Sequence, residues 1–280
     1  MWRHLLPLVL SVAALAGCSR GRVRGGDAGL GRAIAAADVI FAARADPAEA
    51  ERALRAYLDL ETRAPDDPRV LWRLARAYTL RGYRSSGPEG SLDLVTGRGY
   101  ALRCLMLQSE FAGVVHGAGG VVTPAALVNL DAPTLPCVAW AAVSWGRWAH
   151  ARGVSGVAMD VNVIEGLGDR TLALGGEDFG SGRALAIHGV TASLRPTLTG
   201  EGWDAAEESL RKATALAPER LTPKVDLALY VLRPQGRDAE LRALLQEVLD
   251  HPLVDGDPNR PENERAKARA RDALGVTGSD

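Results

Sequence analysis

The sequence is poor in the residue patterns from which β-sheets are built. Aromatic residues make up only 5% of the 280 residues, and stretches that alternate polar with β-branched or aromatic residues are scarce. Strands need such alternation, so its scarcity argues against a β-rich fold. Alanine, leucine and arginine dominate instead, and all three favour helices. We therefore predict an all-α protein.

An excess of positive charge is also absent. The chain has 33 basic and 34 acidic side chains, for a formal net charge of −1. General nucleic-acid binders carry a basic surface, so nucleic acid is not among the partners that we expect.

The sequence contains no recognisable catalytic or metal-binding motif. No serine or cysteine lies in a nucleophile-elbow context, and no His-Glu-x-x-His motif occurs. Residues 255–259 begin like a calcium loop, but Arg260 replaces the required turn glycine and Ala266 the closing glutamate. We predict a protein that is not an enzyme and has no metal site and no cofactor.

Cysteine is rare, and each of the three has a distinct context. Cys104 and Cys137 could form a disulfide in an oxidising compartment, or be two small buried hydrophobic residues. The sequence leaves both alternatives open, because it does not show how far apart they lie. Two cysteines alone offer too few ligands for a metal.

The N-terminus has the pattern of an export signal. A short basic start precedes an apolar run, residues 5–14, which is too short to span a bilayer. Leu15-Ala16-Gly17-Cys18 follows and resembles a bacterial lipobox, in which the cysteine is acylated. We predict a signal peptide over 1–17 and lipidation of Cys18; the alternative is an ordinary signal peptide with a chance cysteine. Residues 18–31, rich in glycine and arginine, are expected to be a flexible tether.

A repeated spacing indicates helical hairpins in the remaining chain. Small, large, small and proline residues follow one another at intervals of four, three and five in residues 206–218, and the same spacing recurs in residues 53–65 with Ala53, Tyr57, Leu60 and Pro65. This spacing is typical of the second helix of a tetratricopeptide unit. We predict a tetratricopeptide-like solenoid of about eleven or twelve antiparallel helices over residues 32–274, with a concave binding face and a frayed tail at 275–280. The expected helices include 136–152, 159–174, 181–195 and 203–217, with a hinge at 196–202 and a glycine-rich loop at 113–123.

Three tryptophans lie close together in the predicted helix 136–152. Trp145 and Trp148 share one face with Ala141, and Trp140 lies on a neighbouring face. Tryptophans in such a helix fill a core or line a groove for an apolar ligand or a partner. His188 has the same two interpretations: a satisfied core histidine or part of the groove lining.

Several segments together resemble one known family, the TatT proteins, which are the lipoprotein T components of TRAP (tripartite ATP-independent periplasmic) transporters. The segments are the lipobox ending at Cys18, the tryptophan–glycine helix over 140–148, the hairpin over 182–216, and the closing helix with Asn263, Ala266, Arg269 and Ala270. The hinge at 196–202 departs from a plain repeat and fits this family.

The resemblance implies an all-α lipoprotein that docks the periplasmic solute-binding protein of a TRAP transporter. It also implies a hydrophobic cleft or pore for a small apolar ligand, and self-association into a homo-oligomer. The expected groove residues are Trp140, Trp145, Trp148, His188 and Asn263.

We therefore expect a non-enzymatic accessory protein of solute uptake, anchored to the bacterial cell envelope and facing the periplasm. Ser19 after the cysteine favours the outer membrane over the inner one. The alternative is a general tetratricopeptide scaffold lipoprotein for envelope or outer-membrane assembly.

Overall fold

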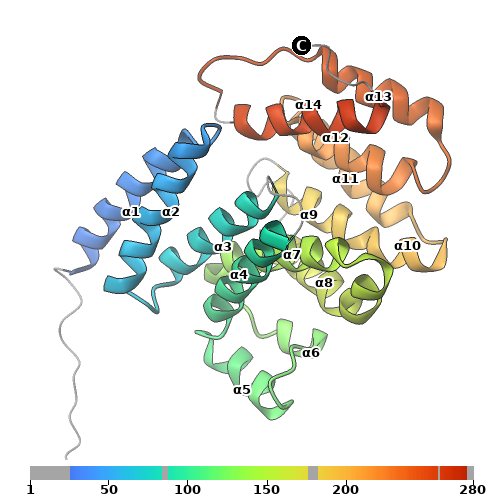
Figure 1. Cartoon of the computed structure of the whole chain (residues 1–280). Coiled ribbons are helices and arrows are strands. Elements are labelled where there is room, and N and C mark those ends of the chain that lie inside the picture. The colour runs from blue at the N-terminus through green and yellow to red at the C-terminus, as the bar shows by residue number, and fades with distance from the viewer. Residues whose placement is uncertain (1–25, 84–87, 176–181, 258, 276–280) are drawn as a thin grey trace, which may run out of the picture.

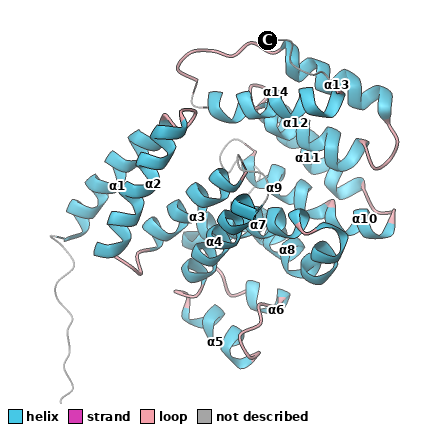
Figure 2. Cartoon of the chain, in the orientation of Figure 1, coloured by secondary structure: helices cyan, strands magenta, loops and turns pink. Residues whose placement is uncertain are grey.

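Helices account for all the regular structure in the part of the chain that the computed structural model describes, residues 26–83, 88–175, 182–257 and 259–275 (Figures 1 and 2). The N-terminal half contains α1 (Gly26–Ala42), α2 (Pro47–Arg63), α3 (Pro68–Gly82), α4 (Pro88–Leu105), α5 (Ser109–Gly117), α6 (Pro124–Leu127) and the 3₁₀ turn η1 (Ala132–Thr134). The remainder contains α7 (Leu135–Ala151), α8 (Gly153–Gly175), α9 (Arg183–Ala192), α10 (Leu194–Thr199), α11 (Asp204–Leu216), α12 (Leu221–Leu227), the π-helical turn η2 (Ala228–Leu232), α13 (Asp238–Asp250) and α14 (Arg260–Leu274). The predicted all-α fold is confirmed.

Local sequence signals explain where the N-terminal helices begin. Asp46 and Asp67 each precede a proline, and each carboxylate accepts a hydrogen bond at 2.8 Å from a backbone N–H two residues further on. An N-cap carboxylate followed by proline at the first helical position is a favourable helix start. The chain therefore turns sharply between α1, α2 and α3.

The repeated spacing marks the two helix faces that are buried. Ala53, Tyr57 and Leu60 of α2 are at most 4% exposed, and so are the corresponding residues of α11, Ala206, Leu210 and Ala213. In both helices the small residues let the neighbouring helix approach, and the proline follows the helix end.

Consecutive helices pack side by side. Helix α3 packs on α4, α4 on α7, α7 on α8, α8 on α9, and α9 on α11. Three groups of buried side chains fill the interior: one around α1–α3, a large one from α3 to α9, and one formed chiefly by α11–α14. This stack is the predicted solenoid, with more helices than the eleven or twelve expected because short ones such as α6 and α10 interrupt it.

The two ends of the stack meet. Arg44, in the turn after α1, forms a bidentate ion pair with Glu262 in the first turn of α14. Arg265 of α14 donates to the carbonyl oxygen of Leu80 in α3 at 3.1 Å. Figure 1 shows the resulting arrangement, in which α1–α2 and α13–α14 flank the central helices.

Two expected loops differ in the structure. The glycine-rich segment 113–123 was predicted to be a loop, but α5 extends through it to Gly117, because Phe111 and Val115 lie one turn apart and are both buried. The hinge 196–202 is partly helical as α10, which holds Pro196 within its first turn, where proline is tolerated. The chain then leaves α10 at Gly200, whose φ of +83° suits glycine.

Part of the segment predicted to be a flexible tether is helical. Helix α1 begins at Gly26, so residues 26–31 belong to it rather than to a flexible segment. The reason is that Leu30 and Ile34 lie one turn apart and both pack into the α1–α3 core. Residues 1–25, including the predicted signal peptide and Cys18, lie outside the described residues, as does the tail from 276 to 280.

Candidate functional site

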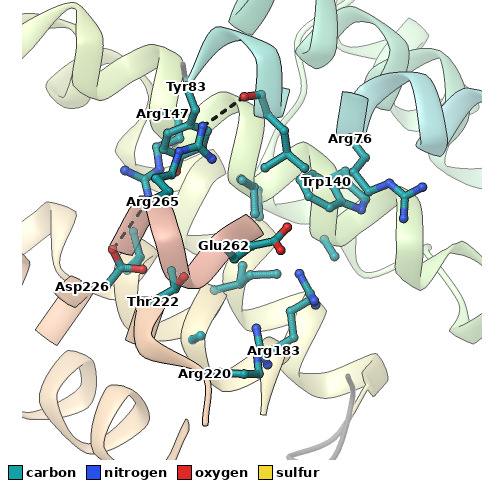
Figure 3. Close-up of a pocket in the computed structure, with 18 of the residues that line it drawn as sticks. Arg76, Tyr83, Trp140, Arg147, Arg183, Arg220, Thr222, Asp226, Glu262 and Arg265 are labelled. Atoms are coloured by element: carbon teal, nitrogen blue, oxygen red, sulfur yellow. Dashed lines mark hydrogen bonds and ion pairs between the residues drawn. The ribbon is translucent and has the colours of Figure 1, made fainter. Parts of the chain in front are cut away.

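A cavity of about 510 Å³ lies where the two ends of the stack meet. Helices α3, α7, α9 and α14 each turn one face toward it, and the α1–α2 turn and α12 complete its wall. Figure 3 shows its labelled side chains converging from these helices. Sites of about 300–1,000 Å³ suit small-molecule ligands, so this cavity is the candidate functional site.

Helix α7 supplies an apolar wall. Pro136, Trp140, Val143 and Arg147 line the cavity at intervals of four, three and four residues, which is one face of a helix. The first three are apolar. Arg147 stands at the far end of the same face and donates to the hydroxyl of Tyr230.

Helix α9 supplies a second wall with the same polarity. Its cavity face carries a charged residue at the start, Arg183, followed by Ile187 and Val190 at helical spacing, and Leu194 at the start of α10 also lines the cavity. Gly189, on the opposite side of α9, lies against α11: a side chain there would meet Leu210 at 2.6 Å. This close crossing fixes the orientation of α9.

Arginines dominate the charged lining. Seven of them face the cavity, against two carboxylates: Arg44, Arg76, Arg147, Arg183, Arg220, Arg265 and Arg269, with Asp226 and Glu262. The described residues of the lining carry a formal charge of +5, although the whole chain carries −1. The fold has thus gathered positive charge that the sequence distributes over most of its length.

Most of these arginines are held by aromatic rings and carboxylates. Arg147 and Arg265 lie 4.1 and 4.5 Å from the ring centre of Tyr83, on the wall that Figure 3 shows. The buried carboxylate of Asp226 is 2.8 Å from a guanidinium nitrogen of Arg269 and 3.7 Å from one of Arg147. Burial opposes the charge of Arg269, but Asp226 and the hydroxyl of Tyr230 outweigh it, and the pKa of Arg269 is raised.

Arg76 is packed rather than free. Its guanidinium lies 3.9 Å from the ring centre of Phe41 and 5.0 Å from that of Trp72. It also donates to the Asp38 carboxylate at 3.2 Å and to the hydroxyl of Tyr57 at 3.0 Å. Burial lowers the pKa of Arg76, and the charges of Tyr57 and Asp38 oppose that shift.

Arg183 differs from the other arginines of the cavity. It makes no hydrogen bond or ion pair with any other residue that the structure describes. Burial and the neighbouring charge of Arg220 lower the pKa of Arg183 to about 10, and only Glu262 opposes them. Burial lowers the pKa of Arg220 as well. Figure 3 shows both arginines pointing toward Glu262.

Two of the five predicted groove residues line the cavity, Trp140 and Asn263. Asn263 is 2% exposed, and its amide joins two segments: it accepts from the Leu221 N–H at 3.0 Å and donates to the Glu219 carbonyl at 2.8 Å. Asn263 therefore holds the turn that precedes α12 and presents little of itself to the cavity.

The other three predicted groove residues lie elsewhere. Trp145 is 8% exposed and belongs to the central core, while Trp148 stacks with the guanidinium of Arg98, 4.0 Å from its ring centre. His188 lies on the opposite face of α9 from the cavity, where its Nδ1 is 2.8 Å from the Ser209 hydroxyl and its Nε2 3.2 Å from the Asp169 carboxylate. None of these three residues lines the cavity.

The sequence did contain the signal for the correct faces. Trp140, Val143 and Arg147 are spaced by three and four residues, and so are Arg183, Ile187 and Val190, with intervals of four and three. The predicted groove, however, included no arginine. Their meeting depends on contacts between α3, α9 and α14, which no local pattern reveals.

Cys104 of α4 and Cys137 of α7 are paired in the structure as a disulfide with Cα atoms 5.8 Å apart. Both residues are about 1% exposed, within the core between these helices. The disulfide closes a loop that contains α5 and α6. It therefore links both ends of this loop to α4 and to α7, the helix that lines the cavity.

A second cavity, of about 660 Å³, lies between α2, α3 and α14. It shares a row of residues with the first one: Phe41, Arg44, Leu80, Tyr83, Arg147, Glu262, Arg265 and Arg269. The Arg44–Glu262 ion pair and the side chains around Tyr83 thus separate the two cavities.

The described residues contain no group of three or more histidine, cysteine, aspartate or glutamate side chains placed to hold a metal ion. Of their helices, none has the length and apolar character needed to cross a bilayer. The cavity combines apolar walls with hydrogen-bond donors from arginine side chains, a combination typical of small-molecule binding sites.

Comparison with known protein families gives a match. The family model described as the TRAP transporter T-component, TAtT, matches residues 94–277, well over half of the chain and including α7, α9 and α14. No curated protein matches the sequence.

Proposed function

The chain belongs to the TRAP transporter T-component family, and from this premise we propose that it is a non-enzymatic accessory lipoprotein of a TRAP-type solute uptake system. In this proposal it docks a periplasmic solute-binding protein and holds a small ligand with apolar character in the central cavity. The single observation that carries the proposal is that the family match covers α7, α9 and α14, three of the four helices that turn a face toward this cavity.

The cavity supports a holding role rather than a chemical one. Its lining combines the apolar wall of α7 with arginines, two threonines and two tyrosines. Catalysis of acyl transfer would need a nucleophile beside a base. Among the described residues, the lining contains neither serine, cysteine nor histidine.

The anchor proposal rests on sequence. Leu15-Ala16-Gly17-Cys18 supplies the acylation site, and residues 19–25 leave a short link before α1. We propose that lipid on Cys18 holds the protein at the envelope, with its helical domain in the periplasm and the outer membrane the favoured location. Labelling cells with a palmitate analogue should mark the wild-type protein and leave Cys18→Ser unmarked; equal labelling of both would contradict lipidation at this site.

The docking proposal is tested in the native envelope. Mild cross-linking and affinity purification of the tagged lipoprotein should recover a periplasmic solute-binding protein encoded beside TRAP permease genes. A tagged, unrelated lipoprotein serves as the control. Recovery of outer-membrane assembly proteins in place of a solute-binding protein would favour the general scaffold alternative. Light scattering of the purified protein tests the proposed homo-oligomer.

A further inference from the structure

The carboxylates that pair with the arginines are unevenly distributed in the central cavity. Asp226 neutralises the end near Arg147 and Arg269, and Arg265 donates to the Leu80 carbonyl. At the other end lie Arg183 and Arg220. Glu262 is the carboxylate of the lining that attracts both, and Glu219 attracts Arg220 as well. The carboxylate of Glu262, however, is engaged by the guanidinium of Arg44.

Arg183 is therefore a partly buried cation without a partner of its own among the described residues. Burying a charge is costly unless it is paired and hydrogen-bonded. A guanidinium has five N–H donors arranged to bind a carboxylate or phosphate bidentately. An anion in the cavity would pair with the charge of Arg183 and accept hydrogen bonds from its guanidinium.

The apolar surface continues directly from this cation. Ile187 and Val190 follow Arg183 along the same face of α9, and Leu194 at the start of α10 also lines the cavity. Trp140 and Val143 of α7 line the same cavity. A ligand with charge at one end and an apolar body would match both parts.

We infer that the cavity binds a small amphipathic organic anion, with its anionic group at Arg183 and Arg220 and its apolar body between α7 and α9. The inference deepens the proposed function, on which it rests, by naming the class of ligand. The neutral apolar ligand that the family resemblance implies would leave the Arg183 guanidinium without an anionic partner among the described residues.

Matched probes test the charge requirement directly. Decanoate and decanol share a ten-carbon chain and differ in charge at pH 7.5. Titration calorimetry would use residues 18–280 with Cys18→Ser, so that no acyl chain competes for the cavity. We expect decanoate to bind at least about tenfold more tightly than decanol, the effect of one charge-assisted hydrogen-bond pair. Its affinity should fall as salt is added.

Two variants locate the anionic group. Arg183→Met and Arg220→Met keep an apolar stem but remove the donors, and each should reduce the preference for decanoate over decanol. Arg242→Met, on the exposed side of α13, is the matched control and should retain the preference. Circular dichroism establishes that each variant is folded, and two variants are used so that failure of one to fold leaves the other to decide.

Three results would overturn the inference: equal affinity for the two probes, no binding of decanoate at millimolar concentration, or a preference unchanged in both arginine variants. Short-chain phosphatidylglycerol is added to distinguish a membrane lipid from a free acid. Weaker binding than decanoate is expected, and tighter binding would overturn the assignment to a small organic acid. These outcomes are independent of docking, so failure to recover a solute-binding protein would reject the proposed function without altering the result on the ligand.

Discussion

The guanidinium of Arg44 and the carboxylate of Glu262 form an ion pair between residues 218 positions apart, with Nε of Arg44 3.1 Å from Oε1 of Glu262. The pair joins the α1–α2 turn to the start of α14 and lies in the lining of both cavities. Their side chains are 17% and 28% exposed. This contact closes the arc of helices around the central cavity.

Removal of this ion pair should loosen the N-terminal hairpin. Glu262→Gln leaves Arg44 without its carboxylate, while the α1–α3 core remains intact. We expect faster hydrogen exchange of backbone amides in α1 and α2, with little change in α7 and α8, because local opening follows the contacts that hold each unit. Glu208→Gln on the exposed face of α11 is the control. Unchanged exchange in α1 and α2 would show that the pair does not hold the hairpin.

The two tryptophans of α7 should respond differently to truncation. Trp145 is buried in the central core, so Trp145→Ala should destabilise the fold by about 3–5 kcal/mol. Trp140→Ala removes part of the cavity wall and should weaken decanoate binding with a smaller loss of stability. Chemical denaturation and calorimetry on both variants measure this contrast. A larger loss of stability for Trp140→Ala than for Trp145→Ala would contradict the assignment of faces.

The disulfide should contribute to stability through the loop that it closes. Cys104 and Cys137 are separated by 33 residues, for which chain entropy predicts a contribution of about 3.5 kcal/mol. Cys104→Ala with Cys137→Ala should lower the free energy of unfolding by about that amount in oxidising buffer. In reducing buffer the difference between wild type and variant should become smaller. A constant difference in both buffers would assign the effect to packing and not to the bond.

The close packing of α8 against α9 should depend on Gly168, which has no side chain at the contact. A Cβ at Gly168 would lie 1.9 Å from Oγ1 of Thr191, so Gly168→Ala should destabilise the protein by about 1–3 kcal/mol. Gly99 in α4 is exposed with nothing within 4 Å, and Gly99→Ala should stabilise by about 0.5–1 kcal/mol. Thermal denaturation of the pair provides the test. Destabilisation by both substitutions to the same extent would refute the close crossing.

Stability at low pH should depend on Asp38. Burial raises its pKa, but hydrogen bonds and charges from Arg73, Tyr57 and Arg76 outweigh that effect and leave the pKa lowered. A lowered folded-state pKa stabilises the fold above the unfolded value of about 3.9, and this contribution is lost as the pH falls through the folded value. Asp38→Asn should therefore lower the melting temperature at pH 7, with a gap that narrows below about pH 4. Asp59→Asn, at an exposed position of α2, is the matched control.

The N-terminal hairpins show how much of the fold could be predicted locally. Asp46-Pro47 and Asp67-Pro68 mark helix starts, because capping and proline geometry involve only neighbouring residues. In contrast, the loop predicted over 113–123 was wrong over its first part. Glycine disfavours helix by only about 1 kcal/mol, and burial of Phe111 and Val115 exceeds that penalty.

The site was only partly predictable for a similar reason. Both faces of α7 carry apolar residues, so periodicity placed Trp140 and Trp145 on different faces but could not tell which face met the cavity. That choice depends on α3, α9 and α14, which come from distant parts of the chain.

The sequence by itself determined the helical class, the repeated buried faces of α2 and α11, and the family to which the chain belongs. These follow from spacings of three and four residues, which express the geometry of a single helix. Only the tertiary structure decided that Trp140 lines a cavity, that Trp145 fills the core, and that seven arginines meet around one hollow. The physical reason is that burial and charge depend on neighbours brought together by folding, as Arg44 and Glu262 are.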